Sequence, residues 1–97
     1  MDRFIKGRFR LNFEGYSNEK YDNLILAKWP SIDNFCASAK VEGEIYDTED
    51  LKVYFEYRVV RHTIKECRAI RTLVKAKLKE VYGVSVEETF CAEGSRY

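Results

Sequence analysis

The strongest pattern of apolar and polar positions runs from Thr63 to Tyr82. At about 100° per residue, this segment forms two adjacent stripes on one helix. The apolar stripe consists of Cys67, Ile70, Val74, Leu78 and Val81. The second stripe contains only cations, namely Lys65, Arg68, Arg71, Lys75 and Lys79. Thr63 with Glu66 fits a capping box and Gly83 is a natural stop, so the pattern predicts one long amphipathic helix.

Three other segments alternate with period two and are predicted to be strands. The first is Arg3–Glu14, in which Gly7 falls on the apolar phase and indicates a bulge or a close-packed neighbour. The second begins at Phe35 and reaches Ile45, and the third spans Leu51–Val59. The acidic turn Tyr46–Asp50 is short enough to join the last two as an antiparallel hairpin.

A short helix is predicted between the first two strands, from apolar residues at helical spacing between Tyr21 and Trp29. Pro30 is expected to end it, because the residue before a proline is pushed out of the helical region. Residues 31–34 are then a loop. The tail, residues 84–97, is ambiguous: Val84 and Val86 suit a short strand, and the last four residues are expected to fray.

These elements define the predicted fold class as α+β, in the order strand, helix, strand, strand, helix. Two amphipathic helices are expected to cover one face of a three-stranded antiparallel sheet and to leave the other face polar. A chain of 97 residues suits a single domain, residues 1–97.

The formal net charge of +1 hides a local excess. Residues 63–82 carry six cations and two acids, which is +4 and leaves −3 for the rest of the chain. The cationic stripe has three interpretations: a solvated helix face, a phosphate-binding face, or a docking face for an acidic protein. The polar sheet face either adds contacts to a partner or is covered by a second subunit; its side chains include Arg8, Arg10, Lys52, Tyr54 and Arg58.

No catalytic motif is recognisable. His62 is the only histidine, and its position between a strand and a helix favours a surface or capping role. The acids Asp47, Glu49 and Asp50 lack the spacing of a calcium loop and favour a solvated turn. We therefore expect a non-enzyme without a cofactor.

The cysteines Cys36, Cys67 and Cys91 are odd in number, widely spaced and without a C-x-x-C pair, which predicts neither zinc nor disulfides. Cys67 belongs to the apolar helix stripe, whereas Cys36 falls on the polar phase of its predicted strand. No apolar run approaches the roughly 18 residues of a membrane span. Together these features favour a cytoplasmic protein.

The passage LKVYFEYRVVRHTIKECRAIRTLVKAKLKEV and the order of elements resemble the smallest subunit of the KEOPS complex, the family that includes the CTAG and LAGE antigens. In that family the last strand leads into a helix that opens with an apolar residue, Arg-Ala, and an asparagine-serine pair. Cys67–Arg68–Ala69 matches the first part. The residues Ile70–Arg71–Thr72–Leu73 depart from the second part, and His62 stands where the family has an acid.

The resemblance implies a non-catalytic accessory subunit of a complex that makes threonylcarbamoyladenosine in tRNA. It further implies a dimer formed through the sheets, with itself or with a paralogue, and helices that dock on the catalytic subunit. The tRNA would be contacted in part by the cationic stripe, which either meets tRNA or docks on protein. The competing classes are a free-standing KH-like RNA- or DNA-binding domain, for which no G-x-x-G loop is present, and a small ferredoxin-like enzyme or ligand binder.

Overall fold

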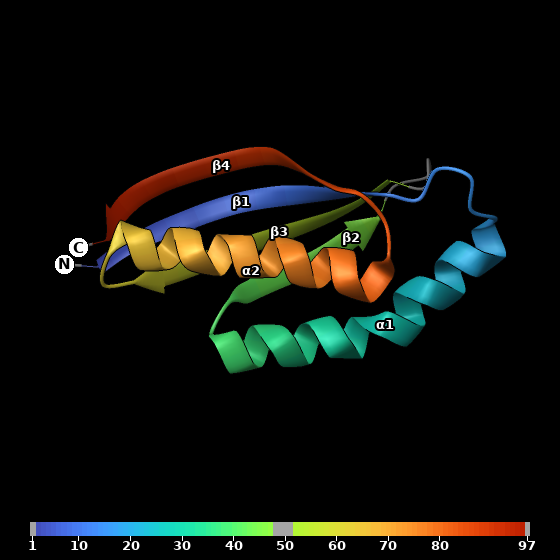
Figure 1. The fold of residues 1–97 in the computed structure, drawn as a ribbon, viewed down its shortest axis with the longest axis horizontal. Helices are drawn as coiled ribbons and strands as arrows, with labels where there is room; N and C mark the ends of the chain where they lie inside the picture. The colour runs from blue at the N-terminus through green and yellow to red at the C-terminus, as the bar shows by residue number, and fades with distance from the viewer. Residues whose placement is uncertain (1, 48–51, 97) are drawn as a thin grey trace.

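The computed structural model describes residues 2–47 and 52–96. Its elements are β1 (Asp2–Asn12), α1 (Asn18–Ala39), β2 (Glu42–Asp47), β3 (Lys52–Arg61), α2 (Ile64–Tyr82) and β4 (Val86–Arg96). The strands form one antiparallel sheet in the order β2-β3-β1-β4 (Figure 1). This is the ferredoxin-like arrangement of two interleaved β-α-β units. The predicted α+β class with helices on one face of an antiparallel sheet is confirmed.

The predicted three-stranded sheet is wrong, because the ambiguous tail forms a fourth strand. β4 pairs with β1 along its length, from Leu11 opposite Val86 to Asp2 opposite Arg96. Two features hide this strand in the sequence. Its helix-facing positions are mostly polar, and a register shift opposite Arg8 and Phe9 breaks the period of two. The segment expected to fray is therefore ordered as far as Arg96.

The predicted end of the first helix is also wrong. α1 continues through Pro30 to Ala39, so residues 31–34 are helical and β2 begins only at Glu42. Ile32 and Cys36 are buried one turn apart, and their burial holds the second half of the helix on the core. A proline inside a helix removes one hydrogen bond and bends the axis. Figure 1 shows α1 bent near its middle, with its first turns lying beyond the end of the sheet.

The C-terminus of α1 is closed by residues that the sequence does not mark. Lys40 adopts the left-handed conformation with φ of 56°, and Val41 N–H donates to the carbonyl of Cys36 at 2.9 Å. This is a Schellman motif with lysine in the usual glycine position. Arg61 at the end of β3 donates to the carbonyls of Ala39 and of Lys40, the latter at 3.2 Å. A distant strand thus supplies part of the cap.

The ends of α2 follow the sequence prediction. The Thr63 hydroxyl accepts a hydrogen bond from Glu66 N–H at 3.2 Å and donates to the Glu66 carboxylate at 2.9 Å. Gly83 is left-handed, with φ of 66°, and its N–H donates to the Lys79 carbonyl at 2.9 Å. The local capping residues therefore account for the length of this helix.

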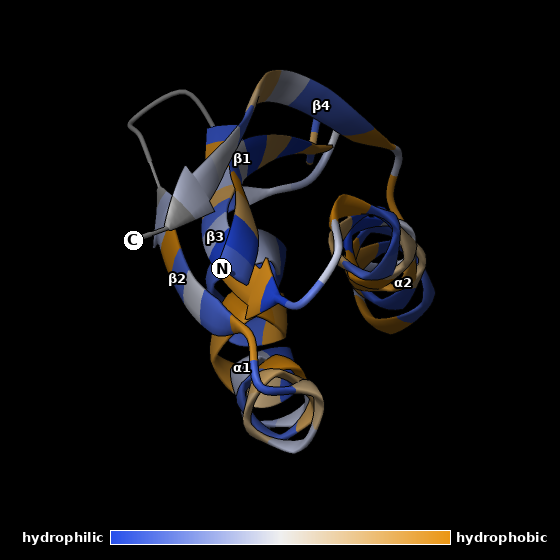
Figure 2. Ribbon diagram, turned by 90° about the vertical axis from the view of Figure 1, so that its left-hand side faces the viewer, coloured by the Kyte–Doolittle hydropathy of each residue, from blue (hydrophilic) through white to orange (hydrophobic). Residues whose placement is uncertain are grey.

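One core lies between the sheet and the helices. Figure 2 shows both helices on the same side of the curved sheet. The strands contribute alternate residues, which are Ile5, Phe9 and Leu11 from β1 and Val53, Phe55, Tyr57 and Val59 from β3. From the apolar stripe, Cys67, Val74 and Leu78 are buried, whereas Ile70 and Val81 are half-buried. No helix within the described ranges is long and apolar enough to cross a membrane.

The close-packed neighbour predicted for Gly7 is Tyr57. A Cβ at position 7 would lie 2.6 Å from the Tyr57 hydroxyl oxygen, so only glycine leaves room for the ring. The ring of Tyr57 also stacks on Phe9, with centroids 5.1 Å apart. Part of the acidic turn predicted between the hairpin strands, including Glu49 and Asp50, lies outside the described residues.

Candidate functional site

The cationic stripe of α2 is divided by its contacts with β4. Arg68 forms a two-pronged ion pair with Glu93, with nitrogen-to-oxygen distances of 2.7 and 2.8 Å. This pairing raises the pKa of Arg68 and lowers that of Glu93. Arg71 lies 4.0 Å from Glu88 and donates to the Cys91 sulfur at 3.4 Å. The acids missing from the cationic stripe are therefore supplied by β4, of which the sequence indicated only a possible short start at Val84 and Val86.

The other three members of the stripe, Lys65, Lys75 and Lys79, are exposed. None of them forms an ion pair with another residue in the described part of the chain. Lys77, on an adjacent face, pairs with Glu80 at 3.9 Å. An anionic partner on this side of α2 would thus meet three free lysines rather than five free cations.

The open face of the sheet carries charges that are largely paired across the strands. Arg8 contacts Glu56 at 3.2 Å, Arg58 contacts Glu42 at 3.8 Å, and Arg10 contacts Glu87. The two opposite charges within each cross-strand pair of this kind neutralise each other. The face is therefore close to neutral, although the sequence shows it as rich in cations.

Aromatic side chains lie among these charges. Tyr46 and Tyr54 stack with centroids 5.8 Å apart, and Arg8 lies 5.8 Å above the Tyr54 ring. The Tyr46 hydroxyl donates to Glu56 at 2.7 Å, and this hydrogen bond is the main reason that the pKa of Glu56 is lowered. On β4, Phe90 is 48% exposed. An exposed phenylalanine among neutralised charges makes this face suitable for contact with another surface.

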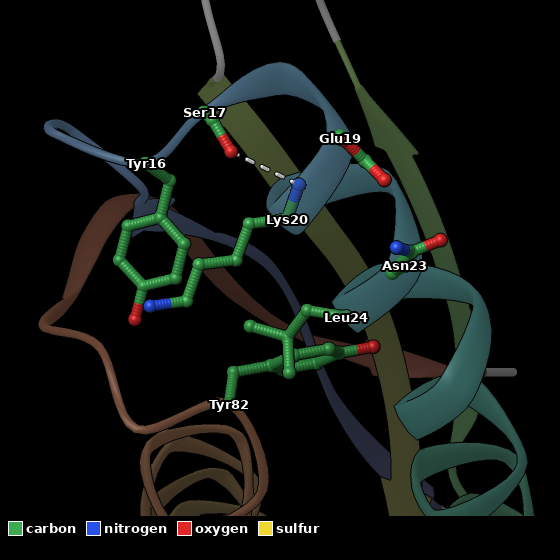
Figure 3. A pocket seen from close by; sticks show the side chains of 7 residues that line it. All are labelled: Tyr16, Ser17, Glu19, Lys20, Asn23, Leu24 and Tyr82. Carbon is green, nitrogen blue, oxygen red and sulfur yellow. Dashed lines mark hydrogen bonds between the residues drawn. The ribbon is translucent and has the colours of Figure 1, made fainter.

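A shallow pocket of about 600 Å³ lies where the N-terminus of α1 meets the C-terminus of α2 (Figure 3). It is lined by Tyr16, Ser17, Glu19, Lys20, Asn23, Leu24 and Tyr82. The Lys20 ammonium group lies 4.9 Å from the centre of the Tyr16 ring, and Ser17 caps α1 by accepting from Lys20 N–H at 3.2 Å. Burial raises the pKa of Tyr82 to about 12, so its hydroxyl stays protonated. Ser17 and Lys20 thus serve the helix cap and the ring contact, whereas the Tyr82 hydroxyl has no hydrogen-bond partner among the described residues.

His62 lies at the surface, with its side chain 82% exposed and Nδ1 3.4 Å from an Asp2 carboxylate oxygen. This placement matches the surface role expected for it. No group of three or more potential metal ligands occurs within residues 2–47 and 52–96.

The three cysteines are free thiols in different environments. Cys67 is in the core, as the apolar stripe predicts. Cys36 was predicted on the polar side of a strand, which is wrong: it is on α1 and buried, and burial followed by Asp33 raises its pKa to about 11. Cys91 is exposed on β4, beside Arg71. Sequence reasoning missed this contact of Cys91 because it left the structure of the tail, residues 84–97, ambiguous.

No protein-family model and no curated protein matches this sequence. Among solved structures, the chain is similar to "De novo designed protein Foldit4", at 13% sequence identity over 100% of both chains and with a TM-score of 0.47. A likeness at that level carries no argument about function.

Proposed function

We propose that this chain is a non-catalytic scaffold subunit of a tRNA-modifying assembly of the KEOPS kind, which forms threonylcarbamoyladenosine. It dimerises through its sheet, with a second copy or a paralogue, and contributes to tRNA binding. The observation that carries the proposal is the open sheet face, on which exposed aromatic side chains lie among charges already paired within the chain.

The state of the charges favours a protein partner on this face. Burying an unpaired charge is costly, whereas charges that enter an interface already paired with good geometry cost less. Arg8, Arg10 and Arg58 each have a glutamate partner from a neighbouring strand. Phe90 and Tyr46 then supply the aromatic contact area that interface centres favour.

The tRNA contact is proposed for the other side of the molecule, at Lys65, Lys75 and Lys79. Each is an exposed ammonium group on one stripe of α2, free to displace counterions from phosphates. Arg68 and Arg71 belong to the same stripe, but each already has an acidic partner on β4, Glu93 for Arg68 and Glu88 for Arg71. Their share in the binding is expected to be smaller.

The dimer is tested by light scattering on the purified chain and on Phe90→Lys. The wild type should have twice the monomer mass, and the variant should be monomeric because a lysine would be buried opposite the paired charges. Leu26→Lys is the matched control, since Leu26 is 75% exposed on α1, away from the sheet. If the partner is a paralogue, the wild type but not Phe90→Lys should capture it from the native cell. A monomer that captures no protein would overturn the scaffold proposal.

The tRNA contact is tested with the assembled complex over a series of salt concentrations. Lys75→Glu with Lys79→Glu should weaken tRNA binding and lower the slope of log affinity against log salt by about one unit per lost phosphate contact. Lys28→Glu on α1 is the charge-matched control for each of the single variants, Lys75→Glu and Lys79→Glu, measured beside the double variant. If the wild type and the double variant give superimposable lines of log affinity against log salt, this helix does not contact RNA. RNA binding by the isolated chain, without any protein partner, would instead favour a free-standing RNA-binding domain.

A further inference from the structure

Three residues form a row across the helix-facing side of the sheet. Gly7 on β1 pairs with Tyr57 on β3 and with Cys91 on β4. The Tyr57 ring extends over Gly7, since its oxygen would lie 2.6 Å from a Cβ at that position. The ring therefore crosses β1, and its hydroxyl points toward Cys91.

The Tyr57 hydroxyl is a buried donor without a strong acceptor. The residue is 2% exposed, and its oxygen has no nitrogen or oxygen partner among the described residues, so that the Cys91 sulfur, a weak acceptor, is the group that it faces. Burial, followed by the nearby Cys91 sulfur and the Glu88 carboxylate, raises the pKa of Tyr57, so the hydroxyl keeps its proton. Buried polar groups seldom lack a partner, and a native exception calls for a physical explanation.

A second donor approaches Cys91 from the helix layer. Arg71 Nη1 lies 3.4 Å from the sulfur, and this contact is the main reason that the pKa of Arg71 is raised. The same nitrogen lies 4.0 Å from Glu88, which holds the guanidinium on this side of α2. The sulfur of Cys91 thus has a guanidinium beside it, a tyrosine hydroxyl directed toward it, and access from solvent.

We propose that Cys91 is a site of oxidation by hydroperoxides to a sulfenic acid, whose oxygen is bound by Tyr57 and Arg71. The thiolate attacks one peroxide oxygen, so that an S–O bond forms and the O–O bond breaks. Sulfur loses two electrons to the peroxide. The hydroxide that leaves takes up the proton released by the thiol, and the net products are the sulfenic acid and water. The new oxygen is a stronger acceptor for the Tyr57 hydroxyl than the thiol sulfur.

The test exposes the full chain to hydrogen peroxide, traps sulfenic acid with dimedone and locates the label by peptide mass spectrometry. Cys91 should be labelled, whereas the buried Cys36 and Cys67 of the same molecule serve as internal controls. Tyr57→Phe keeps the ring over Gly7 and removes only the hydroxyl that lacks a strong acceptor, so the melting temperature should not fall. The same variant should slow oxidation of Cys91 about tenfold, the effect of one hydrogen bond to a charged group.

Tyr82→Phe is the matched control, because Tyr82 is also buried and its hydroxyl also lacks a nitrogen or oxygen partner among the described residues. It lies at the pocket near α1 and should leave the rate unchanged. Oxidation of Cys91 in Tyr57→Phe at the wild-type rate would overturn the proposal, as would labelling of Cys36 as fast as that of Cys91.

Discussion

The two helices end for different reasons, and the contrast explains what each needs in order to form. α2 has its cap residues in its own sequence, in Thr63, Glu66 and Gly83. α1 begins at a local cap, Ser17, but passes through Pro30 and ends at Lys40 with help from Arg61 of β3. Local chemistry thus sets both ends of α2, whereas tertiary contacts set the second half of α1. A helix of the second kind depends on the rest of the fold being in place.

The largest effect is expected from shortening a core residue of α2. Leu78→Ala should cost about 2–5 kcal/mol, because Leu78 is fully buried and the substitution leaves a cavity. Ile70→Ala is the comparison on the same stripe, and its cost should be smaller because Ile70 is half-buried. Denaturant midpoints measure both. Equal losses would mean that the stripe packs evenly, contrary to the observed burial.

Removing the distant cap of α1 should have the next largest effect. Arg61→Ala deletes the guanidinium that donates to the carbonyls of Ala39 and Lys40, and should cost about 2 kcal/mol, as expected for hydrogen bonds from a charged donor. The loss of amide-exchange protection should concentrate in residues 31–39. Faster exchange spread evenly over both helices would argue against a specific cap.

The local cap of α2 should contribute less. Thr63→Ala removes the acceptor of the Glu66 N–H and should cost about 1 kcal/mol. Here the faster exchange should be limited to the first turn of α2. Thr63→Ser keeps the hydroxyl and is the control, since it should retain most of the stability.

The smallest effect is expected at the contact between α2 and β4. Arg68 lowers the pKa of Glu93 below its ordinary value of 4.5. A carboxyl with a lowered folded pKa contributes stability above its unfolded pKa and loses it as the pH falls through the folded pKa. Wild type should therefore lose stability relative to Glu93→Gln as the pH falls below about 4.5, and the two should differ little under more acidic conditions. Parallel acid-denaturation curves would show that the pair contributes nothing, as some exposed pairs do.

The same contrast between local and tertiary contacts explains how much of the fold was predictable from the sequence. Periodicity located β1, β3 and α2, because these elements depend on residues near one another in the chain. Gly7 indicated a bulge or a close-packed neighbour, but the neighbour itself, Tyr57, lies on another strand and had to come from the structure. The continuation of α1 depends on the burial of Ile32 and Cys36 against strands elsewhere in the sequence. β4 has few apolar residues and is held by pairing with β1. The full length of neither element could be inferred from a local pattern.

The candidate surfaces show the same limit. The sequence placed five cations of α2 on one stripe, but Glu88 and Glu93, the partners of Arg71 and Arg68, lie on a strand of which the sequence indicated only a possible start at Val84 and Val86. Likewise, the sequence alone shows Arg8, Arg10 and Arg58 as cations without partners, whereas the strand register places a glutamate beside each. The residues were visible in the sequence, whereas their degree of neutralisation depended on strand pairing.

Three glycines of the sheet share one arrangement with a consequence for how this sequence can change. Gly7, Gly43 and Gly94 each lie under an aromatic ring from another strand, of Tyr57, Phe55 and Phe4 respectively, and a Cβ on each would come within 2.4–2.6 Å of that ring's atoms. In each case the ring occupies the volume that a side chain on the neighbouring strand would otherwise fill. The side-chain size tolerated at each of these glycine positions therefore depends on the aromatic residue that covers it. An alanine at position 7 should be tolerated only after position 57 has become smaller, so that the order in which the two substitutions arise decides whether the intermediate protein folds.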